Sequence, residues 1–156
     1  MTPAVKALER AGLAFELREY AHDPRADSYG MEAADSLGID ADSVYKTLLA
    51  QVDTRELVVA IVPVSTTLNL KALAKAAGGK RADMATPADA QRATGYVLGG
   101  ISPFGQKKRL RAVVDHGVLA LATVYVSGGR RGLEIGIAPA DLIAVTDALA
   151  AAIANR

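Results

Sequence analysis

The segment Gly-Gly-Ile-Ser-Pro at positions 99–103 constrains the fold more than any other stretch of this chain. Its two glycines allow backbone angles that a Cβ forbids, and they let a ligand approach the main chain closely. Pro103 fixes its own φ and pushes Ser102 toward an extended conformation. Four cations follow directly behind the segment: Lys107, Lys108, Arg109 and Arg111. This pattern indicates either a structural turn with a solvated charge run, or a rigid loop that receives a small group on a phosphate-bearing carrier.

The composition indicates one globular domain, residues 1–156, with an aliphatic core. Hydrophobic residues make up 51% of the chain but aromatic residues only 4%, so Ala, Val, Leu and Ile must build the core. The net charge of +1 argues against general nucleic-acid binding, although a local basic patch stays possible. The absence of Cys excludes disulfides, thiolate metal sites and an enzyme cysteine nucleophile. Neither a signal peptide nor a membrane-spanning run is expected, which is compatible with a cytoplasmic location.

Caps, prolines and apolar spacing predict five helices. The first follows Thr2, carries Val5 and Leu8 on one face, and stops at Gly12. The predicted ranges are 3–11, 29–37, 70–77, 88–93 and a last helix that begins at Pro139. The expected buried stripe of this last helix consists of Leu142, Val145, Leu149 and Ile153.

Apolar runs of strand length predict the β structure. Residues 13–20 alternate, so Leu13, Phe15 and Leu17 should form one buried face. The other ranges are 44–52, 57–62, a short extended piece at 80–83, 111–115, a strand within 119–126, and 133–137. Because strands and helices mix without regular βαβ alternation, we expect a compact α/β or mixed α+β domain around a curved, barrel-like mixed sheet with surrounding helices.

Seven groups of short motifs give the chain a resemblance to a known family. They are Met1–Val5, Tyr20–Pro24, Val44–Leu48, Thr94–Tyr96, Gly99–Pro103, Gly105–Arg109, and Tyr125–Gly129 with Arg131–Leu133. In this order they resemble the YbaK type of bacterial aminoacyl-tRNA deacylase, the free-standing Cys-tRNA(Pro) deacylases related to the editing domain inserted in prolyl-tRNA synthetase. Each motif alone is weak, but together they cover nearly the whole chain and are specific.

The resemblance implies hydrolysis of cysteine that has been attached by mistake to the proline tRNA. Cysteine and proline are similar in size, so a synthetase pocket separates them poorly and a second sieve is needed. The resemblance also implies that the substrate's own thiol attacks the ester carbonyl and forms a cyclic thioester, while the enzyme supplies position and electrostatics. The implied partners are mischarged tRNA(Pro) and, in a transient complex, prolyl-tRNA synthetase, with no cofactor.

Lys46 is the expected catalytic side chain, together with the main chain of Gly99 and Gly100. It lies among apolar neighbours of a predicted strand, where burial of its charge is costly without a partner. It would bind the terminal adenosine or phosphate, or polarise the ester; the alternative is a strand-edge lysine that reaches solvent. Thr47 points to the opposite face in an ideal strand, so both can line one site only if the strand is bulged or a loop wraps around it.

Nine further residues are expected to bind the aminoacyl group: Tyr20, Tyr29, Thr47, Ile101, Ser102, Pro103, Ser127, Gly128 and Glu134. For the two tyrosines, an ordinary place in the core is the alternative. Ser127 is not expected to act as a nucleophile, because Ser-Gly-Gly lacks the pattern Gly-x-Ser-x-Gly. Glu134 would anchor the substrate amino group, or else face solvent on the final hairpin.

Five cations are expected either to neutralise phosphates of the tRNA acceptor end or to form an ordinary solvated surface: Lys107, Lys108, Arg109, Arg130 and Arg131. His22 and His116 have no metal-ligand spacing, so no metal is expected. Two other functions stay open. One is a deacylase of the same fold for another mischarged tRNA, such as Ala-tRNA(Pro), and the other is a non-enzymatic tRNA- or nucleotide-binding module.

Overall fold

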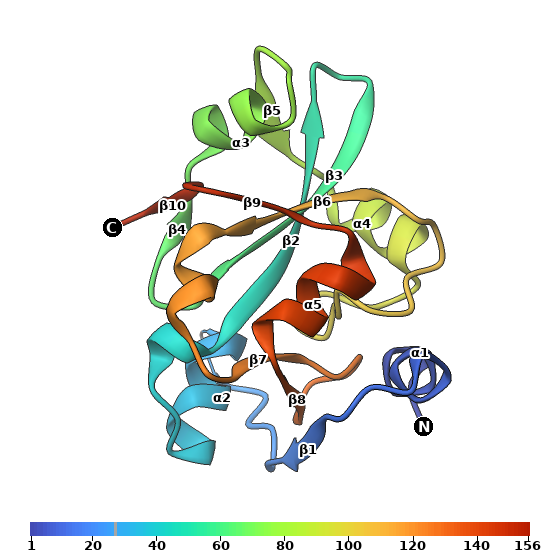
Figure 1. Ribbon diagram of the computed structural model, residues 1–156, viewed down its shortest axis with the longest axis vertical. Coiled ribbons are helices and arrows are strands. Elements are labelled where there is room, and N and C mark those ends of the chain that lie inside the picture. The colour runs from blue at the N-terminus through green and yellow to red at the C-terminus, as the bar shows by residue number, and fades with distance from the viewer. Residues whose placement is uncertain (27) are drawn as a thin grey trace.

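The computed structural model describes residues 1–26 and 28–156, and most of its strands form two sheets around a shared hydrophobic core (Figure 1). The larger sheet has the strand order β5 (Ala82–Met84), β2 (Tyr45–Val52), β3 (Glu56–Pro63), β6 (Arg111–Asp115), β9 (Leu149–Ala151). The smaller has the order β1 (Glu16–Glu19), β8 (Leu133–Ile137), β7 (Val124–Ser127). A separate short pair consists of β4 (Thr67–Leu68) and β10 (Ala154–Asn155).

The larger sheet is mixed, as the sequence predicted. Its β2 pairs antiparallel with β3 and β5, whereas β3, β6 and β9 run parallel to one another. The expected mixed α/β class is therefore confirmed. The barrel-like closure is wrong for the residues that the structure describes, because their strands divide into separate open sheets.

Four of the five α-helices described begin where a local side chain accepts a free amide of the first turn, and α5 begins at a proline without such a cap. They are α1 (Pro3–Ala11), α2 (Tyr29–Leu37), α3 (Leu70–Ala76), α4 (Pro87–Thr94) and α5 (Pro139–Thr146). Side-chain oxygens of Thr2, Asn69 and Thr86 accept amides three residues onward, as the predicted caps require. Gly12 and Gly38 end α1 and α2 in the left-handed region, each with a φ of 68°.

The last helix is shorter than predicted. Asp147 leaves the helix with a φ of 53°, and the chain then returns as β9, which pairs in parallel with β6. Leu149 consequently lies on this strand and is 52% exposed, whereas Ile153 is fully buried in a cluster with α3. The helical spacing of these two residues was therefore misleading, because they belong to an extended C-terminal arm whose β9 forms an edge of the larger sheet.

The first strand is also shorter than predicted. Only Glu16–Glu19 pairs with β8, and β1 is an edge strand of the smaller sheet. Leu17 is 41% exposed, so the predicted buried face of Leu13, Phe15 and Leu17 is wrong at its last position. Leu13 and Phe15 do pack against the main core.

The main core lies where β2, β3 and β6 meet β7 and β8, and α1, α4 and α5 contribute to it. A second cluster fills the other face of the larger sheet under α3, and a third lies under α2. In Figure 1, α3 and β5 lie at the top and the smaller sheet at the bottom, with α2 at the lower left. In the part of the chain that is described, no helix is long and apolar enough to cross a membrane.

Candidate active site

A pocket of about 290 Å³ opens where β2, the start of α2, the glycine-rich segment and the β7–β8 turn meet. Many of the residues predicted from the sequence line it: Tyr20, Tyr29, Lys46, Thr47, Gly99, Ile101, Ser127, Arg130 and Glu134. The sequence reasoning missed others, including Ser28, Gly30, Tyr45, Leu48, Leu98 and Leu133. Most of these are neighbours of predicted residues, so adjacency to the motifs was the signal that could have found them.

Lys46 lines the pocket from the start of β2 and has a backbone partner. Its Nζ donates a hydrogen bond to the carbonyl oxygen of Thr66 at 2.7 Å. Thr66 lies in the turn after β3, where its hydroxyl donates to the carbonyl of Pro63 at 2.8 Å. Partial burial lowers the pKa of Lys46 below its usual value. The side chain is therefore an oriented, partly desolvated cation, and two of its N–H donors have no acceptor among the described residues and can serve a ligand.

The two faces of β2 reach the same pocket because the pocket lies along the strand's edge. β2 pairs with β3 residue by residue from Tyr45 to Val52, so the strand is not bulged. Its other edge pairs with β5 only over residues 50–52. The edge at residues 45–48 lines the pocket, and side chains from both faces lie around it. Lys46 and Thr47 can therefore line one pocket without the bulge that an alternating strand seemed to require.

Two buried polar atoms on the pocket wall have no hydrogen-bond partner among the described residues. They are Oγ1 of Thr47 and Oε2 of Glu134, whose residues are 8% and 6% exposed. Burial raises the pKa of Glu134 to about 8. The pKa of Tyr20 is also raised, mainly by burial and secondly by the nearby charge of Glu134. Leaving a buried polar group unpaired costs about 1–3 kcal/mol of stability. A bound ligand with polar groups could supply the missing hydrogen bonds, so these two atoms indicate where such a ligand would bind.

The two glycines of the segment are needed because other parts of the protein approach them closely. Gly99 has a φ of 84°, and a Cβ there would lie 2.5 Å from Cδ2 of Tyr29 and 2.6 Å from Nε of Arg131. A Cβ on Gly100 would lie 2.9 Å from Cα of Arg130. The sequence predicted that a ligand would make the close approach. In the structure the approaching groups belong to α2 and to the β7–β8 turn, and only Gly99 of the two lines the pocket.

Four predicted substrate-site residues lie off the pocket wall and support the loops around it: Gly100, Ser102, Pro103 and Gly128. Ser102 is fully buried, and its hydroxyl accepts the amide of Phe104 at 3.2 Å. Pro103 lines a different depression of about 230 Å³. The carbonyl of Gly128 accepts the hydroxyl of Thr2, which ties the chain's first turn to the loop of Ser127. This geometry therefore favours a supporting role for these four residues over direct contact with substrate.

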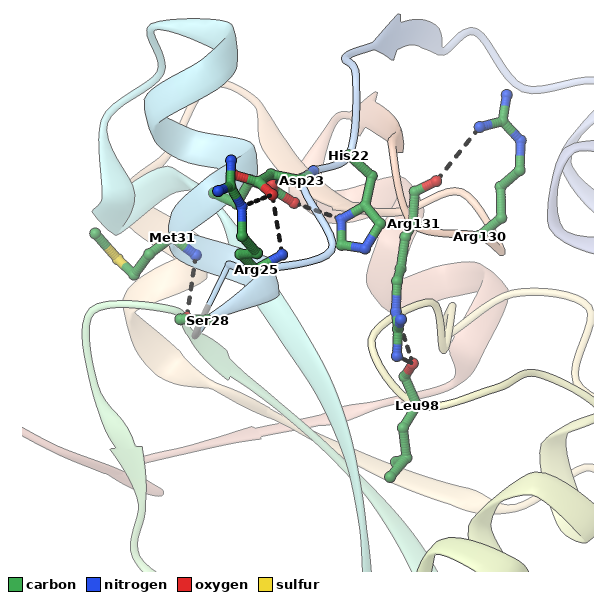
Figure 2. A network of polar contacts seen from close by, with 9 residues as sticks. His22, Asp23, Arg25, Ser28, Met31, Leu98, Arg130 and Arg131 are labelled. Atoms are coloured by element: carbon green, nitrogen blue, oxygen red, sulfur yellow. Dashed lines mark hydrogen bonds and ion pairs between the residues drawn. The ribbon is translucent and has the colours of Figure 1, made fainter.

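The predicted tRNA-binding cations fall into two groups. Lys107, Lys108 and Arg109 are exposed and do not line the pocket. Arg130 lies on its wall and pairs loosely with Glu19, at 3.6 Å between Nη2 and Oε2. Arg131 reaches the carbonyl of Leu98, as Figure 2 shows. Of the second group, only Arg130 lines the pocket, and the guanidinium of Arg131 is engaged by a contact within the protein.

The described residues that line the pocket include no ready pair of nucleophile and base. The hydroxyl of Ser127 accepts the amide of Gly129 at 3.1 Å, and neither histidine lines the pocket. Nδ1 of His22 lies 2.7 Å from a carboxylate oxygen of Glu32 instead. Across residues 1–26 and 28–156, no cluster of three or more His, Asp or Glu side chains is arranged to hold a metal ion. The site can bind and polarise a ligand, but it shows no serine or histidine arrangement for covalent catalysis.

Comparison with known proteins identifies the family. Residues 23–145, which include most of the pocket wall, match the aminoacyl-tRNA editing domain. The chain belongs to this family. The resemblance drawn from the sequence motifs is thus confirmed, and membership makes the chain an aminoacyl-tRNA deacylase that acts on mischarged tRNA.

Relatives of the editing domain match it over almost its full length. A protein of Enterococcus faecalis named "Putative Cys-tRNA(Pro)/Cys-tRNA(Cys) deacylase EbsC" is 33% identical, and the match covers 99% of this chain and 94% of the relative. The crystal structure of "a putative trans-editing enzyme for prolyl tRNA synthetase" is similar with a TM-score of 0.87 at 25% identity, covering 99% and 96% of the two chains. The hypothetical protein APE2540 has the same TM-score and identity, with 98% and 99% covered.

Proposed function

We propose that this editing domain is a free-standing, cytoplasmic deacylase for Cys-tRNA(Pro) that works in transient complex with prolyl-tRNA synthetase. The observation that carries the proposal is that one small pocket combines an oriented lysine with two buried polar atoms that have no partner among the described residues. The relatives named for Cys-tRNA(Pro) deacylation and for trans-editing support the choice of substrate.

The pocket suits the aminoacyl end of a tRNA better than a larger ligand. Its volume of about 290 Å³ lies at the lower end of the range for small-molecule sites. The carboxyl group of Glu134 offers an anchor for the substrate's ammonium group, which would favour its ionised form. Oγ1 of Thr47 offers a further hydrogen bond to a polar substrate atom. Tyr20 and Tyr29 line the pocket with aromatic rings that exclude water.

The proposed chemistry uses the nucleophile of the substrate itself. The cysteine sulfur forms a bond to the ester carbonyl carbon, the bond from that carbon to the ribose oxygen breaks, and the thiol proton ends on the released ribose hydroxyl. Water then opens the cyclic thioester and gives free cysteine. Lys46 would stabilise the negative charge that develops on the carbonyl oxygen, and the surrounding loops would hold the thiol against the carbonyl.

A substrate series tests this proposal directly. The purified protein should deacylate Cys-tRNA(Pro) rapidly and leave Ser-, Ala- and Pro-tRNA(Pro) nearly untouched, because only cysteine carries a thiol. Lys46→Ala should lower kcat by about a hundredfold, as expected when an electrostatic partner of the developing oxyanion is removed. Lys71→Ala, which changes an exposed lysine of α3, is the matched control and should behave like the wild type.

Three results would contradict the proposal. Equal cleavage of Cys- and Ser-tRNA(Pro) would exclude thiol assistance, and preference for Ala-tRNA(Pro) would assign the enzyme to a different mischarged tRNA. Binding of Cys-tRNA(Pro) without faster breakdown would indicate a tRNA-binding module. A parallel assay on Cys-tRNA(Cys) measures tRNA selectivity, since the name of the Enterococcus relative includes both tRNAs.

A further inference from the structure

Arg131 connects three separate segments that form the pocket wall. Its guanidinium carbon lies 4.0 Å from the centroid of the Tyr29 ring, which belongs to the start of α2. Its Nη2 and Nε donate to the carbonyl oxygen of Leu98 at 2.8 and 3.2 Å. Arg131 itself belongs to the β7–β8 turn. One side chain therefore joins α2, the glycine-rich segment and this turn, and Figure 2 shows its contact with Leu98.

The packing around Arg131 leaves little freedom at the glycine-rich segment. The space beside Gly99 is filled by the Tyr29 ring and by Nε of Arg131, and backbone atoms of Arg130 and Arg131 fill the space beside Gly100. The amide of Gly100 also donates to the carbonyl of Val97 at 3.0 Å. Glycine pairs otherwise adopt a wide range of backbone angles, so these contacts select one loop conformation.

Tyr29 also contacts a second ring. The His22 ring lies against that of Tyr29, with the ring centroids 5.7 Å apart. Nδ1 of His22 lies 2.7 Å from Oε1 of Glu32, and the other oxygen of that carboxylate accepts the amide of Asp23 at 2.7 Å. Tyr29 therefore contacts both a histidine that is held against α2 and the guanidinium of Arg131.

We propose that Arg131 is a positioning residue, which holds Tyr29 and the segment 97–101 at a fixed separation and so sets the shape of the wall that faces Lys46. This inference rests on the proposed function, because it takes the pocket as the substrate site. It also replaces the sequence-based expectation for Arg131, which placed it among the phosphate-binding cations. The two hydrogen bonds to Leu98 and the stacked ring engage the guanidinium in a contact within the protein.

The distinction between these roles depends on the shape of the guanidinium group. A phosphate contact needs mainly a positive charge, and lysine supplies one. A clamp needs the planar fork, which donates two hydrogen bonds to one carbonyl while its face covers an aromatic ring. Arg131→Lys therefore separates the two roles, and Tyr29→Leu tests whether the ring acts through the same contact.

The experiment compares wild type, Arg131→Ala, Arg131→Lys, Tyr29→Leu and the double variant Tyr29→Leu/Arg131→Ala. In deacylation of Cys-tRNA(Pro), we expect both Arg131 variants to lose about ten- to a hundredfold in kcat/KM, mainly through kcat, since a misplaced wall disturbs the reactive geometry. The salt dependence of KM should not change. The double variant should be no worse than the poorer single variant, because the two residues act as one unit. Arg92→Ala, at an exposed position of α4, is the control.

Hydrogen exchange gives a readout that needs no substrate. Amides of residues 97–101 should exchange faster in Arg131→Ala and Arg131→Lys than in the wild type, while the central strand β3 stays protected, which excludes general unfolding. Full activity of Arg131→Lys, a weaker salt dependence of Arg131→Ala, or unchanged exchange would overturn the positioning role. A wild-type protein that cleaves no aminoacyl-tRNA would instead refute the proposed function, and the exchange comparison would still decide whether Arg131 holds the segment.

Discussion

Replacing Glu134 with glutamine should stabilise the fold at alkaline pH and have little effect near pH 5. Glu134 lies on β8, is 6% exposed, and has one carboxylate oxygen without a partner among the described residues. Burial raises its pKa from 4.5 to about 8. Between these two values the folded protein keeps a proton that the unfolded chain has released, so stability falls as the pH rises through this window.

The size of the effect follows from the raised pKa. Moving a pKa from 4.5 to about 8 corresponds to ~5 kcal/mol, because each tenfold change in the protonation equilibrium is worth about 1.4 kcal/mol. Relaxation of the pocket around the ionised carboxylate reduces this, so we expect a difference of ~2–5 kcal/mol. Because glutamine carries no charge at any pH, the Glu134→Gln variant does not lose this free energy of unfolding as the pH rises.

Urea unfolding of both proteins from pH 5 to pH 9.5 measures this difference. The free energy of unfolding of Glu134→Gln relative to the wild type should rise with pH and level off above about pH 8. Glu9→Gln, on an exposed position of α1, tests whether any such exchange has the same effect. A relative stability that is flat across the whole range would refute the reasoning. In the same variant, KM for Cys-tRNA(Pro) should rise, since the proposed anchor of the ammonium group is lost.

Two further substitutions test contacts away from the pocket wall. Asp115→Ala should cost ~3–5 kcal/mol in urea unfolding at pH 7, because its buried carboxylate accepts two amides of the C-terminal arm and the guanidinium of Arg156 at 2.6 Å. Burial alone would raise the pKa of Asp115, but these hydrogen bonds lower it overall. The stabilisation should therefore be present above pH 3.8 and be lost on further acidification. A loss of unfolding free energy below about 1 kcal/mol at pH 7 would contradict this. Gly100→Ala should lower stability by ~1–3 kcal/mol and slow deacylation, because its Cβ would meet backbone atoms of the β7–β8 turn; an unchanged melting temperature and rate would show that the turn can move.

Helix starts were predictable because their determinants lie within a few residues of one another. Thr2 and Thr86 each precede a proline at the first helical position and accept an amide three residues onward. The same reasoning failed beyond Thr146. Leu149 and Ile153 keep a helical spacing, but pairing of β9 with β6 takes the chain into an extended arm. Spacing within one segment carries no information about a partner strand elsewhere in the chain.

The candidate site divides in the same way. The sequence predicted Lys46 as a site residue because its charge lies inside an apolar strand, and Gly99 because it belongs to a glycine pair shortly before a proline. Neither pattern reveals that Lys46 donates to Thr66, or that Gly99 packs against Tyr29 and Arg131. The order of the motifs along the chain was enough to identify the editing family, because it compares whole segments and does not depend on contacts.

The amino-acid sequence thus specified the aliphatic core, most of the local elements and the residue types that the site uses. The assembly of the pocket depended on contacts between residues distant in the chain. β2 offers a pocket-lining edge because β5 covers only its end, and the glycine-rich segment keeps its shape because Arg131 meets Leu98 and Tyr29. Local sequence sets which backbone conformations each segment can adopt, but packing between segments selects one of them, and that selection brings the buried carboxyl group and the lysine to the same pocket.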